Sequence, residues 1–219
     1  MQYVLLCHDK KVEKKVRFLT VEEQNKFLQQ AGGSVYYYQF LLVLQTGLRT
    51  GELVGLKWED LDFENRKITV SRSMEFRYGY QEFKIGEPKS KHGYRTIPMT
   101  QTAYEILKLK ESQKDTRYVC DEKYADFVFL CRKGSPVKNS TYDTALYKLT
   151  EKAGIDHISM HTLRHTFATR CIEGGMRPKT LQIILGHSNV GITMNLYVHV
   201  TEDEKVKEVE RIEKALKIV

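Results

Sequence analysis

Between Ser159 and His199, glycine and proline residues divide the chain into short helices, and four chemically active side chains lie near these breaks. They are His161, Arg164, His187 and Tyr197. Side chains at the ends of separate helices can converge where those helices meet. This stretch therefore predicts a helical region with a candidate active site at the helix ends.

His161 and Arg164 are three residues apart, which makes them neighbours on one helical face. A planar guanidinium beside an imidazole suits an oxyanion such as phosphate. Tyr197 is the only aromatic residue with a hydroxyl group in this stretch. It is therefore the candidate nucleophile.

Upstream, the residues from Thr46 to Glu64 read TGLRTGELVGLKWEDLDFE. Apolar residues at steps of three and four predict a helix that Gly47 ends, and Arg49 follows in the turn before a short helix. Glu52 lies three residues after Arg49, so it can pair with the guanidinium or cap the turn. We interpret Glu52 as a group that orients Arg49.

Other helix boundaries carry capping signals. Thr20 and Glu23 form a capping box for a helix that ends near Gly32, and Ser34 is expected to cap the next helix. Thr100 is expected to cap a helix that reaches about residue 114, and a further helix is expected from about 140 to 154.

The segments HTLRHTFATR, LGHSNV and a tyrosine ten residues after His187 resemble the signature boxes of the tyrosine recombinases, the phage integrase family. TGLRTGE resembles the first arginine box of that family, with Arg49 in the catalytic place and Glu52 in the supporting place. The resemblance runs from about Arg17 to about His199. It implies a site-specific DNA recombinase, an integrase that inserts or excises a mobile genetic element.

Alternating patterns predict short strands at 67–71, in parts of 81–85 and at 94–98, and so a small three-stranded antiparallel sheet in a mainly α fold. Between the last two strands, residues 88–93 are expected to form the tip of a hairpin rich in cations. The resemblance places the catalytic lysine there. Lys89 is our choice, and Lys91 stays open as the alternative.

The resemblance also implies a role for each residue. Arg49 and Arg164 would hold the non-bridging oxygens of a DNA phosphate, and His187 would donate its ring N–H to the same group. The remaining roles fall to three residues: His161 as acceptor of the tyrosine proton or as a group that stabilises its transfer, Lys89 as donor to the leaving 5′ oxygen, and Tyr197 as the residue that becomes a 3′-phosphotyrosine. No metal and no other cofactor is expected.

Composition agrees with a DNA partner. The chain has 35 Lys and Arg against 28 Asp and Glu, a net charge of +7, which favours a polyanion. No apolar run approaches the roughly 18 residues of a membrane span, and the first residues do not resemble a secretory signal. We therefore expect a cytoplasmic, nucleoid-associated protein without a membrane partner, and the spacing of its four cysteines predicts no disulfide.

We expect residues 1–16 to be a linker or the end of a preceding module, 17–200 to form the catalytic domain, and 201–219 to form an amphipathic helix. That helix would pack on its own domain or dock on a neighbouring protomer. The resemblance implies double-stranded DNA at specific sites, a synaptic tetramer, and accessory DNA-bending or directionality proteins as partners. It also implies that the chain is a catalytic fragment of a longer protein.

Three other interpretations stay open. His161 and His165, four residues apart, could bind zinc together with His187 or His199. A DNA-binding module without catalytic activity would carry the same basic charge. A type IB topoisomerase would share the phosphotyrosine chemistry, although the sequence boxes favour a recombinase.

Overall fold

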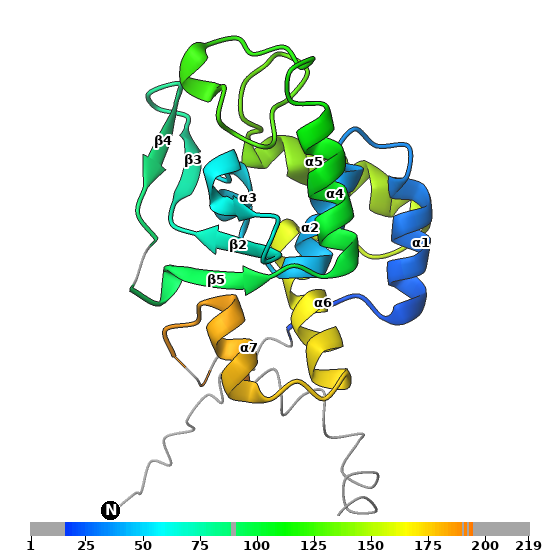
Figure 1. Cartoon of the computed structure of the whole chain (residues 1–219). Helices are drawn as coiled ribbons and strands as arrows, with labels where there is room; N and C mark the ends of the chain where they lie inside the picture. The colour runs from blue at the N-terminus through cyan, green and yellow to red at the C-terminus, as the bar shows by residue number, and fades with distance from the viewer. Residues whose placement is uncertain (1–15, 89–90, 190, 192, 195–219) are drawn as a thin grey trace, which may run out of the picture.

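The computed structural model describes residues 16–88, 91–189, 191 and 193–194, and these form a helical body with two small antiparallel sheets (Figure 1). The helices are α1 (Val21–Ala31), α2 (Tyr37–Thr46), α3 (Thr50–Val54), α4 (Gln101–Ser112), α5 (Asn139–Ala153), α6 (Met160–Glu173) and α7 (Pro178–Leu185). The strands are β1 (Leu61–Asp62), β2 (Lys67–Val70), β3 (Ser73–Arg77), β4 (Glu82–Gly86) and β5 (Arg95–Pro98). Short 3₁₀ turns cover Trp58–Asp60, Lys91–Gly93 and Glu122–Tyr124.

The helix α2 forms the centre of this body, and it contacts α1, α4 and α6. Most of its residues are buried, as expected for a helix that is apolar on nearly all sides. Phe40 packs edge-on against Tyr142 of α5 and is tilted against Phe27 of α1. Each such side chain stabilises the fold by about 1.5–3 kcal/mol when it is fully buried. Because α2 is fixed on several sides, the turn at its C-terminal end has a defined position.

Most of the expected helix boundaries are confirmed, including the Thr100 cap of α4 and the helix from about 140 to 154, and one is wrong. The Thr20 and Glu23 capping box is present, and Gly47 ends α2 in the left-handed conformation with φ 64°. Ser34, however, does not cap α2. Its hydroxyl accepts from the backbone N–H of Tyr36 at 3.2 Å, and the chain makes one further turn before α2 begins at Tyr37.

The three-stranded sheet has the order β1-β2-β5, with Ile68 of β2 opposite Ile97 of β5. Its third strand is therefore β1, and the expectation that residues 81–85 would join this sheet is wrong. They form part of β4, which pairs only with β3 in a separate hairpin, where the rings of Phe76 and Phe83 pack edge to face with centroids 5.0 Å apart. The loop at 88–93 thus connects two sheets and is not the tip of a hairpin.

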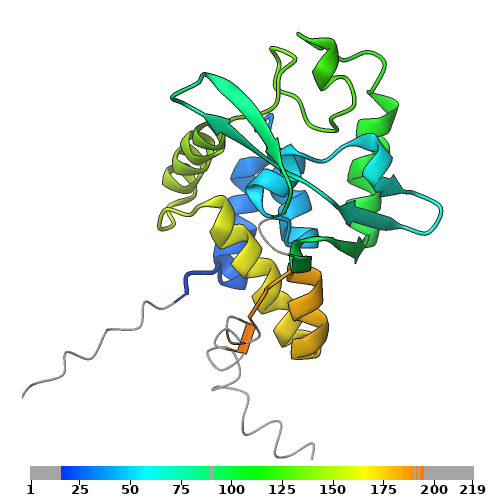
Figure 2. The same ribbon diagram turned by 90° about the vertical axis from the view of Figure 1, so that its left-hand side faces the viewer.

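The helices α6 and α7 pack together through a small cluster of Ala168, Ile172, Leu181 and Leu185. Figures 1 and 2 both show α7 beside α6 and below β5. This packing brings the C-terminal end of α7 close to the ends of α2 and α3. None of the helices among the described residues is long and apolar enough to cross a membrane.

Candidate active site

A cleft of about 440 Å³ lies where α3, β3, α5 and α6 meet the segment that follows α7. Three of the candidate residues line it, Arg49, His161 and Arg164. His187 lies between Gly186 and Ser188, which also line the cleft. The structure therefore brings four of the six candidate residues to one place.

Arg49 lies at the N-terminal end of α3, held by the backbone of two segments. Its Nη1 donates to Glu52 Oε1 at 2.7 Å, and its Nη2 donates to the backbone oxygen of Gly186 at 2.9 Å. The backbone N–H of Arg49 also donates to Glu52 Oε2 at 2.8 Å, so Glu52 both caps the helix and orients the guanidinium. Since 39% of the Arg49 side chain is exposed, its remaining N–H groups can reach a ligand in the cleft.

Glu52 is a buried carboxylate that lies among three arginines. Arg95 binds it in bidentate fashion, Nη1 to Oε1 at 2.9 Å and Nη2 to Oε2 at 2.7 Å, and Arg164 Nη1 lies 4.0 Å from Oε2. Burial alone would raise the pKa of Glu52, but the hydrogen bonds and charges of Arg95 and Arg49 lower it to about 2. Three guanidinium groups around one ionised carboxylate leave two positive charges in excess. Such a surplus suits an anion.

Arg164 of α6 is almost completely buried, with 2% of its side chain exposed. It donates from Nη1 to the backbone oxygen of Gly47 and from Nη2 to that of Leu185, both at 2.6 Å. Burial, followed by the nearby charge of Arg49, lowers the pKa of Arg164 to about 9, which leaves the group charged at neutral pH. One guanidinium therefore joins the C-terminal ends of α2 and α7 at the cleft.

His161 and His165 lie one turn apart on α6, with ring centroids 4.2 Å apart in an edge-to-face arrangement. Burial and the charges of Arg164 and Arg49 lower the pKa of His161. Burial and the neighbouring His161 lower the pKa of His165 to about 4. Both rings are thus neutral at pH 7, and a neutral His161 can accept a proton.

Concerning the zinc interpretation, no group of three or more His, Cys, Asp or Glu that could hold a metal ion occurs among the described residues. His199 lies outside them.

His187 follows Gly186, which ends α7 in the left-handed conformation with φ 63°. Its Nδ1 lies 2.9 Å from Thr193 Oγ1, and its backbone exchanges hydrogen bonds with Gln182. Burial and the charges of Arg164 and Arg49 lower the pKa of His187 to about 3, so the ring is neutral at pH 7. If the Thr193 hydroxyl donates to Nδ1, the proton of the ring is on Nε2, and that N–H can donate to a ligand.

Arg95 is a site residue that our sequence reasoning missed. Besides Glu52, it binds the backbone oxygen of Ile184 through Nε at 2.5 Å and that of Gly93 through Nη1 at 3.1 Å. It therefore joins α3, the end of α7 and the end of the 88–93 loop. A signal was present, because Arg95 occupies a buried position of a strand that alternates between buried and exposed, and a buried arginine requires a partner.

Two candidate site residues, Tyr197 and Lys89, lie outside the described residues. The same holds for residues 1–15 and for the C-terminal segment 201–219, for which a linker and an amphipathic helix were predicted. Lys91 is the first residue of the 3₁₀ turn Lys91–Gly93. The choice between Lys89 and Lys91 thus stays a prediction. Cys120, Cys131 and Cys171 are free thiols, and Cys7 lies outside the described residues.

The sequence matches the family model described as Phage integrase family over residues 17–204. It is 38% identical over 209 residues to the transposase from transposon Tn916 of Enterococcus faecalis, a match that covers 90% of this chain and 51% of that protein. It is 32% identical over 217 residues to a XerC-like tyrosine recombinase of Caldanaerobacter subterraneus subsp. tengcongensis, covering 93% of this chain and 56% of that protein. The chain thus spans about half the length of these curated relatives.

Among solved structures, the fold is similar to that of the Tn1549 transposon integrase in complex with a circular intermediate DNA. The two have a TM-score of 0.78 and 35% sequence identity, over 94% of this chain and 68% of that one. XerA recombinase shares the fold, with a TM-score of 0.66 at 24% identity.

Proposed function

Because the chain belongs to the phage integrase family, we propose that it is the catalytic domain of a tyrosine recombinase that cuts and rejoins DNA at specific sites. The observation that carries the proposal is the meeting of Arg49, Arg95 and Arg164 around Glu52, with two positive charges in excess, in a cleft beside a neutral histidine. These residues come from distant parts of the sequence. A single phosphate is the ligand that such an arrangement suits.

In this proposal the two arginines bind the non-bridging oxygens of the phosphate at the cleavage site. A guanidinium group has five N–H donors. Arg49 and Arg164 each use two donors on the bonds described above, so each keeps donors for the ligand. Because the surrounding backbone fixes both groups in advance, they stabilise the charge that develops on the oxygens at little cost in reorganisation.

The proton steps follow from the neutral state of the two histidines. The Tyr197 hydroxyl attacks the phosphorus and transfers its proton to His161, while the N–H of His187 supports a phosphate oxygen. The bond between phosphorus and the 5′ oxygen breaks, and Lys89 supplies the proton to that oxygen. The product is a 3′-phosphotyrosyl link, which the 5′ hydroxyl of another strand can attack to reverse the step. Since the link retains the phosphodiester energy, ATP is not needed.

The activity and partners of the whole protein are part of the same proposal. Relatives include a transposase from a transposon, and the solved Tn1549 integrase is bound to circular intermediate DNA, which supports duplex DNA of a mobile genetic element as the substrate. We propose integration or excision of such an element, a synaptic tetramer on DNA, accessory DNA-bending or directionality proteins, and the bacterial cytoplasm and nucleoid as the place of action. In such a tetramer the segment 201–219 would dock on a neighbouring protomer.

The proposed function is tested with a nicked duplex that carries the cognate recombination site and traps the covalent intermediate. In the presence of a chelator, the chain should form a protease-sensitive protein–DNA adduct. Tyr197→Phe should form none, because it lacks the attacking oxygen, yet it should still bind the DNA in a gel-shift assay. An adduct with Tyr197→Phe would assign the nucleophile elsewhere, and activity lost in chelator but restored by zinc would favour the metal interpretation.

A further inference from the structure

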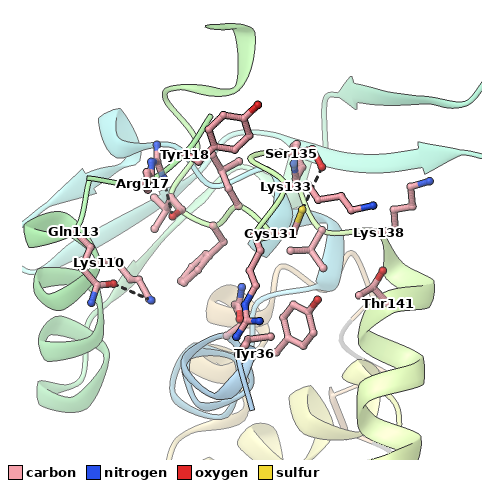
Figure 3. Close-up of a pocket in the computed structure, with 18 residues that line it drawn as sticks. Tyr36, Lys110, Gln113, Arg117, Tyr118, Cys131, Lys133, Ser135, Lys138 and Thr141 are labelled. Carbon is pink, nitrogen blue, oxygen red and sulfur yellow. Dashed lines mark hydrogen bonds between the residues drawn. The ribbon is translucent and has the colours of Figure 1, made fainter. Parts of the chain in front are cut away.

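A second cavity, of about 750 Å³, lies between the N-terminal ends of α2 and α5, the C-terminal end of α4 and the loops on either side of the turn Glu122–Tyr124. Figure 3 shows Lys133 and Lys138 on one side of it and Lys110 on the opposite side. The cavity shares no lining residue with the catalytic cleft. Its volume falls in the range of small-molecule sites.

The charge of the cavity is entirely positive. Five cationic side chains and no carboxylate line it; the cations are Lys110, Arg117, Arg132, Lys133 and Lys138. Within the described part of the chain, none of the five forms an ion pair with an Asp or Glu. Lys110 and Lys138 lie over the aromatic rings of Tyr38 and Phe76, at 5.0 and 3.6 Å from the ring centroids. The cavity therefore suits an anion.

Two helices begin at this cavity, and their orientation adds to the positive potential. The N-cap residues of α2 and α5 are Tyr36 and Lys138, which both line the cavity and make no side-chain capping hydrogen bond among the described residues. Free backbone N–H groups and the helix dipole favour a negative group at such an end. A phosphate at either helix end would therefore be favoured.

Gln39 also lines the cavity, with only 5% of its surface exposed. Its Oε1 atom is buried and has no hydrogen-bond partner among the described residues, so this acceptor is not open to a ligand in the cavity. The cavity therefore selects a ligand by its charge and by its apolar surface.

The wall also has apolar and aromatic residues, among them Val128, Phe129, Val137, Tyr36 and Tyr118. A ligand that matches both features has a flat ring and an anionic group. We propose that this cavity binds a nucleoside monophosphate. The base packs on the apolar and aromatic side chains, and the phosphate lies among the cations at the helix ends.

Trp58, the only tryptophan of the chain, provides a direct signal for binding. The guanidinium of Arg117, which lines the cavity, lies 5.4 Å from the centroid of the indole ring. Titration of the 219-residue chain with adenosine 5′-monophosphate, excited where the base does not absorb, should therefore give a saturable change in Trp58 fluorescence. Calorimetry on the same samples should give the same affinity.

Matched ligands separate the parts of the proposal. Ribose 5′-phosphate, which lacks the base, should bind at least about tenfold more weakly than adenosine 5′-monophosphate. Adenosine and inorganic phosphate should each bind at least about tenfold more weakly. Equal affinity for inorganic phosphate and the nucleotide, or no saturable signal from the nucleotide, would overturn the proposal.

Variants of the protein give an independent test. Lys133→Glu should weaken nucleotide binding about tenfold, whereas Lys152→Glu, on the exposed side of α5, should leave it unchanged. An affinity that Lys133→Glu leaves unchanged, or displacement of the nucleotide by duplex DNA, would contradict this site.

Discussion

At the scale of single residues, the cleft depends on a buried carboxylate whose oxygens are bound by arginines. Glu52 is buried, and it fixes Arg49 and Arg95 by hydrogen bonds to both of its oxygens. A buried charge is tolerated only when partners compensate it, so the three arginines and Glu52 depend on one another. The surplus charge that remains is what makes the cleft suitable for a phosphate.

We predict that Arg95→Lys slows adduct formation at saturating DNA about tenfold, while the affinity for DNA changes less than twofold. A lysine cannot bind both oxygens of Glu52 and also reach the backbone oxygens of Ile184 and Gly93. The measurement is single-turnover cleavage beside a gel-shift titration. The exposed Arg66→Lys serves as the control, and an Arg95→Lys protein that cleaves at the normal rate would show that Arg95 does not position the site.

The lowered histidine pKa values predict how stability depends on pH. His165 and His187 have native pKa values of about 4 and 3, below the unfolded value of about 6.5. At pH values between the native and the unfolded pKa, the unfolded chain binds more protons than the native chain does. The free energy of unfolding therefore falls as the pH drops below about 6.5. Allowing for partial solvent screening, we expect a loss of about 2 kcal/mol between pH 7.5 and 5 in urea unfolding. His165→Gln should make this dependence shallower; an unchanged slope would refute the assignment.

At the scale of helices and strands, the ends of the elements determine the site more than their middles do. Gly47 is the clearest case. Its φ of +64° suits glycine, and an added Cβ would lie 2.5 Å from Cδ1 of Phe167. Its carbonyl also accepts from Arg164. The end of α2 therefore has to keep this conformation for α6 to reach the cleft.

We predict that Gly47→Ala lowers the free energy of unfolding by more than about 2 kcal/mol, since it adds a steric clash to a backbone strain of about 1 kcal/mol. Two matched glycines separate these effects in denaturant unfolding. Gly154→Ala has the same φ region and no atom within 4 Å of the new Cβ, so it should show the backbone cost alone. Gly33→Ala, which has neither problem, should be close to neutral. Equal losses at all three positions would contradict the clash.

These elements also show which features the sequence predicts and which it does not. Local signals, such as the Thr20 capping box and the glycine at the end of α2, identify helix boundaries because they act within a few residues. The pairing of β4 with β3, and the bond between Arg95 and Glu52, depend on contacts across the fold that no local pattern specifies. Arg49, His161, Arg164 and His187 were predicted through their boxes, and the structure places them at or beside one cleft and shows how Glu52 joins the arginines.

At the scale of the whole molecule, the cleft forms only when four distant segments come together. These segments are the α2–α3 turn, strand β5, helix α6 and the end of α7. They bind one another through Glu52 and through the backbone oxygens of Gly47, Leu185 and Gly186. The site is thus a product of the complete fold. The second cavity lies on the other side of the N-terminal end of α5, since Lys138 lines the cavity and Asn139 lines the cleft.

The central claim is that Arg49 and Arg164 neutralise the charge of a single phosphate, and a neutral substrate tests it directly. We would measure the rate of adduct formation on a cognate duplex with either a phosphodiester or a methylphosphonate at the cleavage position. Arg49→Ala should cleave the phosphodiester about 10²–10³-fold more slowly than the unchanged chain does, and it should regain much of that loss on the methylphosphonate, which has no charge to stabilise. A deficit of equal size on both substrates would contradict the account.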